Sequence, residues 1–216
     1  YWAPHQERPF LDEVGKDPGL LKIAFSTITP TGKKADADCT AAVEQTANLC
    51  ETLGHDIISD RPQIDADELA WATLTIIQVD IWSEVETRLR TLNRGLMPDD
   101  LEHVTATVAG RGRDIPASEF LQALHTIHRL GRQVAGFFDD YDILLSPVLL
   151  TPPILLGTLD MSSRDTTTYA TNLSNYFGFT NLFNVTGQPS MSVPLYWTAN
   201  DLPVGLQFTA KFGHEA

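Results

Sequence analysis

The sequence predicts an α/β fold in which a mixed, mainly parallel sheet is flanked by helices. Two short apolar segments, 20–26 and 55–58, enclose a helical segment that ends at Gly54. A β-α-β order within about 40 residues is typical of a parallel crossover unit. Near the end of the chain, segments 190–196 and 204–209 predict a closing pair of strands. Between these parts, apolar residues recur every three or four positions, which predicts further helices.

Capping residues indicate where the first helix begins and ends. Asp36 and Asp38 suit its N-terminus, because negative charge favours the positive end of the helix dipole. Gly54 suits its C-terminal cap. A short buried strand is expected at 143–147, stopped by Pro147. Helical spacing predicts four further helices, over residues 65–94, 98–110, 115–138 and 168–183, with a polar loop over 154–167.

Composition excludes several classes of function. With 216 residues, of which 43% are hydrophobic, the chain can bury the core of one large domain, or of a domain with an extension. Its net charge of −13 would repel a phosphate backbone, so we expect no nucleic-acid partner. No apolar run approaches the roughly 20 residues needed to span a bilayer, so we expect no membrane partner either. The opening residues do not resemble a signal peptide, which predicts a cytoplasmic protein.

The two cysteines are predicted to remain free. Cys39 and Cys50 lie eleven positions apart on one predicted helix, which separates them by about 16 Å along the axis. A disulfide requires Cα atoms closer than about 7 Å. We therefore expect two small buried apolar side chains and a reducing compartment.

Candidate chemistry outside the end of the chain is weak. The sequence contains no G-x-S-x-G, H-E-x-x-H, P-loop or G-x-G-x-x-G motif. His125 and His128 could offer two nitrogens to a metal, but no third ligand is evident, so we expect neither a metal nor a cofactor. Asp139, Asp140 and Asp142 could form an acid/base or cation site. A solvated turn, in which Asp142 fixes the entry to the next strand, is the favoured interpretation.

The segment 184–190 is the most distinctive part of the chain. Its glycine and proline predict an irregular backbone between a helix and a buried strand. Asn184, Thr186 and Gln188 place polar side chains at alternate positions along it. Turns at the end of strands in α/β sheets often border ligands. From composition alone, a structural turn and a pocket wall are equally supported.

At this segment the sequence resembles a known family. T-x-x-x-N-x-x-G-x-P at 180–189, S-x-P at 192–194 and L-P-x-G-x-Q at 202–207 are similar to the C-terminal part of the amidase signature family. Weaker matches at 138–147 and 21–55 follow in the order that the family shows. The resemblance covers nearly the whole chain, and these three final motifs are its specific part.

The resemblance implies a partial amidase-signature fold. Residues 1–216 would form the C-terminal portion of one amidase-signature domain. Within it, residues 1–19 would be an extended connector and residues 20–216 an α/β lobe.

The family hydrolyses amides with a nucleophilic Ser, a bridging Ser on a cis peptide and a Lys base. A serine hydroxyl is a poor nucleophile until a base removes its proton. In the family, this triad lies before the point where this chain begins, and the one Ser-Ser pair here, Ser162-Ser163, lies in a polar loop. No catalytic residue is therefore assigned. We expect the non-catalytic portion of an amidase, inactive alone, whose partner is the missing N-terminal catalytic half.

The resemblance also implies a substrate-binding wall for a small-molecule amide. Members that bind a polar amino-acid amide carry an acidic residue seven positions before the motif asparagine, where this chain has Phe177. The implied substrate is thus an apolar or aryl amide, cleaved to an acid plus ammonia or an amine. Thr180 matches a residue of the acyl channel in members that cleave hydrophobic amides. Phe183, Thr186 and Gln188 are its expected neighbours.

Two other classes of function remain open at this point. The chain could be a free-standing ligand- or partner-binding module that keeps an amidase-like fold without catalysis. It could also be a different hydrolase that uses Asp139, Asp142 or His128. For the amidase portion, we expect an exposed apolar patch, which could also support a homodimer.

Overall fold

A computed structural model describes residues 8–215 of the chain. These residues divide into two compact units, each of which is described separately. The first unit combines the described residues up to Ile64 with Gly131–Pro153 and those from Phe177 onward. The second unit combines Asp65–Leu130 with Ile154–Tyr176.

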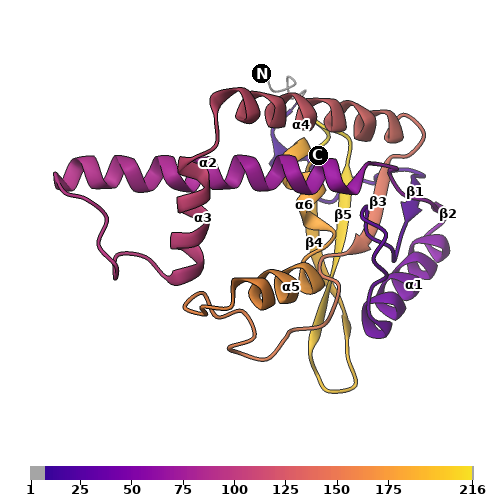
Figure 1. The fold of residues 1–216 in the computed structure, drawn as a ribbon. Coiled ribbons are helices and arrows are strands. Elements are labelled where there is room, and N and C mark those ends of the chain that lie inside the picture. The colour runs from indigo at the N-terminus through magenta and orange to yellow at the C-terminus, as the bar shows by residue number, and fades with distance from the viewer. Residues whose placement is uncertain (1–7, 216) are drawn as a thin grey trace. The chain divides into compact units, whose positions relative to one another are not determined.

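The first unit contains a five-stranded sheet with the strand order β2-β1-β3-β5-β4, counted over the described residues (Figure 1). The β1 strand pairs in parallel with both β2 and β3, whereas β5 pairs antiparallel with β3 and β4. This arrangement confirms the predicted α/β class and the mixed sheet. The strands are β1 (Lys22–Phe25), β2 (Asp56–Ser59), β3 (Ile143–Pro147), β4 (Ser190–Trp197) and β5 (Pro203–Ala210).

The α1 helix (Ala37–Thr52) joins β1 to β2 and completes the predicted parallel crossover unit. Asp36 caps its N-terminus, where a side-chain oxygen accepts a hydrogen bond from the main-chain N–H of Asp38 at 2.9 Å. Gly54 follows its C-terminus with φ of +99°, a left-handed conformation that favours glycine. Both caps therefore act where the sequence predicts them.

The core of the first unit lies between α1 and one face of the sheet. Cys39 and Cys50 are buried there as free thiols, as predicted. The opposite face of the sheet is covered too, because Ala24, Leu144 and Thr209 are also buried. The buried cluster on the α1 side is formed by Ile23, Ala35, Cys39, Ala42, Val43, Ala47, Cys50, Leu145, Leu150, Phe179, Val204 and Leu206.

The second unit is helical. It contains α2 (Ala66–Leu92), α3 (His103–Arg113), α5 (Thr166–Tyr176) and most of α4 (Ala117–Phe137), whose last turns belong to the first unit. Asp65 caps α2 by accepting a hydrogen bond from the main-chain N–H of Glu68. The chain before α5 is tied to α3, because the main-chain N–H of Val104 donates to the Met161 carbonyl at 2.9 Å. Among residues 8–215, no helix combines the length and apolarity needed to cross a bilayer.

The connector at the start of the chain is only partly described. In its described part, every residue except one is exposed, and that one is partly buried. This part contains a single turn of 3-10 helix, η1 (Phe10–Glu13). The prediction of a wholly extended connector was therefore wrong over this turn. The first seven residues lie outside the described part of the chain.

The third predicted helix begins later than its sequence suggested. Residues 98–102 do not join α3, because the preceding loop has its own structure. The two terminal guanidinium nitrogens of Arg94 donate to the Asp100 carboxylate, at 2.6 and 2.8 Å. The main-chain N–H of Met97 donates to the same carboxylate at 2.8 Å. The Pro98-Asp99-Asp100 stretch is thus part of a closed loop instead of a helix start.

The helix predicted over 168–183 is in fact two helices. The α5 helix ends at Tyr176, and α6 (Thr180–Thr186) begins after a break. At the break, a Cβ atom added to Gly178 would lie 2.7 Å from Cγ2 of Thr29 and 2.9 Å from the Leu150 side chain. The chain passes so close to these buried residues that the helix cannot continue through this point.

The strand that follows the distinctive segment was expected to be buried, and this was wrong. The β4 strand is the edge of the described sheet and pairs only with β5. Three of its large apolar side chains are exposed: Met191 by 60%, Leu195 by 46% and Trp197 by 60%. An exposed apolar edge strand has unpaired main-chain groups that can bind another strand and apolar side chains that can pack against a partner.

The Arg94–Asp100 loop carries a testable pH dependence. Hydrogen bonds from Arg94 and from the Met97 amide lower the pKa of the Asp100 carboxyl to about 2. A lowered pKa stabilises the folded loop above the unfolded value of about 4, and this stabilisation is lost as pH falls from about 4 to about 2. We expect an NMR titration of the Asp100 carboxyl to show a midpoint near 2. We also expect Asp100→Asn to speed hydrogen exchange at the Met97 amide, whereas Asp99→Asn should leave it unchanged. An ordinary Asp100 midpoint would contradict the proposed role of this ion pair.

Candidate functional site

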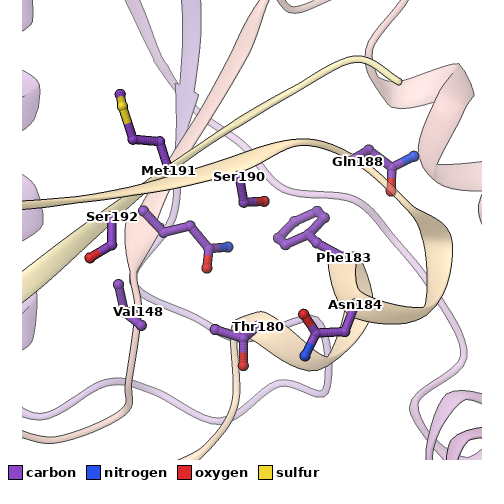
Figure 2. A pocket seen from close by; sticks show the side chains of 9 residues that line it. Val148, Thr180, Phe183, Asn184, Gln188, Ser190, Met191 and Ser192 are labelled. Atoms are coloured by element: carbon purple, nitrogen blue, oxygen red, sulfur yellow. The ribbon is translucent and has the colours of Figure 1, made fainter. Parts of the chain in front are cut away.

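A cavity of about 400 Å³ opens within the first unit, between α6 and the antiparallel end of the sheet (Figure 2). A volume of this size matches the usual range for small-molecule sites, roughly 300–1,000 Å³. It is lined by nine residues: Val148, Thr180, Phe183, Asn184, Gln188, Ser190, Met191, Ser192 and Gln207.

The α6 helix forms one wall. Thr180, Phe183 and Asn184 occupy positions i, i+3 and i+4, which lie on one face of a helix. The ring of Phe183 is directed from α6 toward the strand that carries Ser190 (Figure 2), and this side chain is buried. Gly187 then ends the helix with φ of +84° and turns the chain back toward the sheet.

The sheet forms the polar side of the cavity. Ser190 and Ser192 project from the same face of β4, because side chains alternate along a strand. Gln207 lies opposite Ser192 on β5 and is buried. Thr209 links the group: its hydroxyl accepts a hydrogen bond from Nε2 of Gln207 at 3.3 Å and lies 2.9 Å from the Ser190 hydroxyl. Met191, which follows Ser190, also lines the cavity, and its side chain points to the opposite side of β4 from Ser190 (Figure 2).

Thr186 positions Gln188 from outside the cavity. The Thr186 hydroxyl donates to the Leu182 carbonyl at 2.7 Å and also contacts the side-chain amide of Gln188. The atom of Gln188 that contacts the Thr186 hydroxyl is the side-chain carbonyl oxygen Oε1. The NH₂ group of Gln188 can therefore donate a hydrogen bond to another acceptor. Gln188 is 7% exposed, so the orientation of its amide is tightly held.

The structure brings together three of the five predicted site residues. Thr180, Phe183 and Gln188 line the cavity, whereas Thr186 supports Gln188 without lining it. Phe177 does not line the cavity. The break at Gly178 separates Phe177 from α6 and places it in an isolated bridge with Leu149. The resemblance to the amidase signature family implied that Phe177 belongs to the substrate-binding wall, but Phe177 is not part of this cavity.

The cavity is uncharged. None of its nine lining residues, all within the described part of the chain, carries an ionisable side chain. Amides and hydroxyls at Asn184, Gln188, Gln207, Ser190 and Ser192 can donate and accept hydrogen bonds to a neutral polar group. Such a lining suits an amide bond and disfavours a bare ammonium or carboxylate, because an unpaired charge is costly to desolvate.

The other candidate groups have structural roles. Asp142 accepts a hydrogen bond from the main-chain N–H of Lys22 at 2.8 Å, as the turn interpretation predicts, and Asp139 pairs with Lys211 at 2.8 Å. Burial, together with the nearby Asp36 and Asp38 carboxylates, raises the pKa of the Cys39 thiol to about 12. The thiol is therefore protonated at neutral pH and is a poor nucleophile. In the described part of the chain, no three His, Cys, Asp or Glu side chains gather closely enough to hold a metal ion.

Several lining residues were not predicted, although the sequence carried a signal for three of them. Ser192 and Gln207 belong to the S-x-P and L-P-x-G-x-Q motifs that resemble the amidase signature family. Asn184 is the motif asparagine itself. Val148 directly follows β3, and nothing in its sequence context distinguishes it from a core residue.

Fold and cavity together define an α/β protein with a neutral pocket suited to amide-like ligands. The family model described as Amidase matches residues 2–216, so the chain belongs to the amidase family.

Two relatives and two solved structures illustrate the similarity. The 6-aminohexanoate-cyclic-dimer hydrolase of Pseudomonas sp. (strain NK87) is 28% identical over 224 residues, covering 100% of this chain and 45% of the relative. The enzyme of the same name from Paenarthrobacter ureafaciens is 27% identical, with the same shares covered. A structure of 6-aminohexanoate cyclic dimer hydrolase complexed with substrate has a TM-score of 0.86 and 26% identity, covering 100% of this chain and 46% of that one. A bacterial aryl acylamidase of the amidase signature family has a TM-score of 0.73 at 17% identity, covering 91% of this chain and 41% of that one, and shows the shared fold alone. The chain therefore spans about half the length of the relatives that it matches.

Proposed function

We propose that this chain is the non-catalytic portion of an amidase that hydrolyses carboxylic amides to an acid plus ammonia or an amine. It contributes a wall of the substrate pocket, and a Ser-cisSer-Lys triad is supplied by a missing N-terminal half. Membership of the amidase family and the 45% share of the related hydrolases that the chain covers both support this division.

One observation carries the proposal: the cavity holds serine hydroxyls without a base. Ser190 and Ser192 line it, but none of the nine lining residues is a Lys, His, Asp or Glu. A serine needs a neighbouring base within hydrogen-bond reach to become a nucleophile. The hydrogen-bonding neighbour of the Ser190 hydroxyl is Thr209, which cannot take up a proton at neutral pH. The cavity is therefore equipped to bind an amide but not to attack one.

The neutral lining supports an apolar or aryl amide as substrate. The Phe183 ring and Val148 offer apolar contacts, while Gln188 and Asn184 can hydrogen bond to an amide group. The cyclic dimer of 6-aminohexanoate, for which the related hydrolases are named, is an uncharged molecule of alkyl segments joined by amides. A ligand of that chemistry suits the pocket of this chain better than an amino-acid amide with a free ammonium group.

The exposed edge of the sheet supports the missing half as the partner. The outer edge of β4 has no strand beside it in the described part of the chain, and Met191, Leu195 and Trp197 are exposed along it. Such an edge fits a continuation of the sheet by further strands. A second copy of the chain could occupy the same edge, which would give the homodimer considered above.

The test is the activity of the chain alone on a panel of aliphatic and aryl amides. We expect no release of ammonia or amine, and no labelling by a serine-directed fluorophosphonate, because the pocket lacks a base. The same panel is run with a chimera that joins the preceding residues of the Pseudomonas hydrolase to this chain. Turnover by the chimera, lost on changing the donor half's labelled serine, would support a complementary wall.

The opposite result is equally clear. Turnover by the chain alone, with a label on one of its own serines, would show that it carries its own nucleophile. Binding of neutral amides by the chain, combined with an inactive chimera that folds, would favour a free-standing binding module.

A further inference from the structure

A second cavity, of about 500 Å³, lies wholly within the second unit. Helices α2, α3 and α5 all contribute to its walls. Its size falls within the range of small-molecule sites, roughly 300–1,000 Å³. Neither the motifs that resemble the amidase signature family nor the neutral cavity of the first unit includes any of its lining residues.

Much of this cavity is apolar. Leu74 of α2, Val104 and Val108 of α3, and Leu173 and Tyr169 of α5 line it from three sides. The α3 residues follow the i, i+4 spacing of a single helix face, so the wall is a continuous stripe. An apolar or aromatic body of a ligand would be removed from water against these side chains.

Gln78 introduces a polar group into this largely apolar lining. It is 7% exposed and lines the cavity, where its side-chain amide can donate and accept hydrogen bonds. The residue is held in place because α3 crosses α2 directly against it. A Cβ atom added to Gly112 would lie only 1.8 Å from the Gln78 carbonyl oxygen. An amide held at this position can therefore hydrogen bond to a polar group of a ligand in the cavity.

Arg111 supplies a free positive charge. It lines the cavity from α3, next to Gly112, and no carboxylate among residues 8–215 pairs with it. None of the lining residues is acidic. Four other arginines of the same unit each have a carboxylate partner: Arg90, Arg94, Arg113 and Arg129. Among the described residues of this unit, Arg88, Arg111 and Arg164 form no ion pair, and of these three Arg111 lines the cavity. In a chain with a net charge of −13, an arginine left unpaired at a cavity points to an anionic ligand.

We propose that this cavity binds a small carboxylic acid with an apolar or aryl body. The carboxylate pairs with the guanidinium of Arg111, which matches it as a two-pronged donor. The body lies against the stripe formed by Val104, Val108 and Leu173, and a polar substituent or the acid itself reaches the Gln78 amide. Binding of this kind requires no hydrolysis by the chain, so it stands apart from the proposed amidase role.

The test compares 4-phenylbutyrate with its uncharged analogue 4-phenylbutyramide on the full chain, by calorimetry and by NMR shift mapping. We expect the acid to bind with a Kd of about 1 mM or tighter, given its size. The amide should bind about tenfold more weakly, because a charge-assisted hydrogen bond is lost. The shifts should fall on α2, α3 and α5.

Variants locate the site. Arg111→Gln should weaken binding of the acid about tenfold and leave binding of the amide unchanged. Arg88→Gln removes another arginine without an ion pair in the same unit and should change neither affinity. Gln78→Leu should weaken both ligands, with circular dichroism confirming that the variant is folded. The proposal would be overturned by equal affinity for acid and amide, or by full affinity of Arg111→Gln for the acid. It would also be overturned if the acid does not bind at 10-fold the expected Kd, or if the shifts are confined to the first unit.

Discussion

Replacing Gly112 with alanine is expected to disrupt the second unit, although alanine is the better helix former. The added Cβ would lie 1.8 Å from the carbonyl oxygen and 2.3 Å from the carbonyl carbon of Gln78, and 2.9 Å from the nitrogen of Val79. These are main-chain atoms of α2, so no side-chain rotation relieves the clash. The helices would have to separate by roughly 1.5 Å to restore ordinary contact distances.

The two opposing effects differ in size. Alanine gains about 1 kcal/mol over glycine in helix propensity. Overpacking of a rigid core typically costs about 1–3 kcal/mol and sometimes more. Because the clash is with backbone, we expect the upper end of that range, and therefore a net loss of about 2 kcal/mol or more in the free energy of unfolding.

Gly110 provides the matched control. It lies on the same helix, and a Cβ atom there would meet no neighbour within 4 Å. Gly110→Ala should therefore raise stability slightly, by up to about 1 kcal/mol. Urea unfolding measures both variants, and hydrogen exchange shows where protection is lost. For Gly112→Ala, protection should fall in α2 and α3 while β1 and β3 keep theirs. Equal stabilisation by both substitutions would show that the close α2–α3 crossing does not form.

Much of the fold follows from local signals in the sequence. Asp36 and Gly54 cap α1 where their residue types predict, because each acts within its own segment. The strands at 22–25 and 143–147 appear as predicted, because β-propensity and apolar runs act over a few residues. The parallel pairing of β1 and β2 follows from their separation by α1.

The errors arise where distant residues decide the outcome. The break at Gly178 is imposed by Thr29 and Leu150, which are remote in sequence. The loop before α3 is closed by the Arg94–Asp100 ion pair, which competes with the helix start that Pro98 suggested. The contacts at Gly178 join segments that are remote in sequence. The Arg94–Asp100 pair lies within one short loop, but helical spacing does not encode such a side-chain pairing.

The site shows the same division. Thr180, Phe183 and Gln188 could be predicted because they lie within one short motif around α6. Phe177 was placed by counting back seven positions from the motif asparagine, and it lies before the break at Gly178, outside the residues that line the cavity. Gln207 lines the cavity because it lies opposite Ser192 on the neighbouring strand. This register depends on how β4 and β5 pair in the folded sheet, so a single segment of sequence does not predict it.

Replacing Phe183 with alanine is expected to cost about 3–5 kcal/mol in the free energy of unfolding, the usual range for a buried phenylalanine. Its ring is 5% exposed and forms part of the cavity wall. Leu182, the preceding residue, is fully buried but does not line the cavity, and Leu182→Ala should cost about 2–5 kcal/mol. Stability alone therefore cannot distinguish a pocket residue from a core residue.

A small aromatic amide can distinguish them. Removing the Phe183 ring would leave an aryl-sized space that opens onto amide and hydroxyl groups, so benzamide could place its ring there and hydrogen bond to Gln188 or Asn184. Benzamide at ten times its Kd would then restore about 1.4 kcal/mol to Phe183→Ala in urea unfolding. The space left by Leu182→Ala lies off the cavity wall, so the same benzamide concentration should restore little stability to that variant.

Rescue of Phe183→Ala alone would show that the pocket binds aryl amides, because only a ligand that fills both the apolar and the polar part of the cavity gains from that substitution. Equal rescue of both variants, or rescue of Leu182→Ala alone, would mean that the ring of Phe183 belongs to the core and that the substrate wall lies elsewhere.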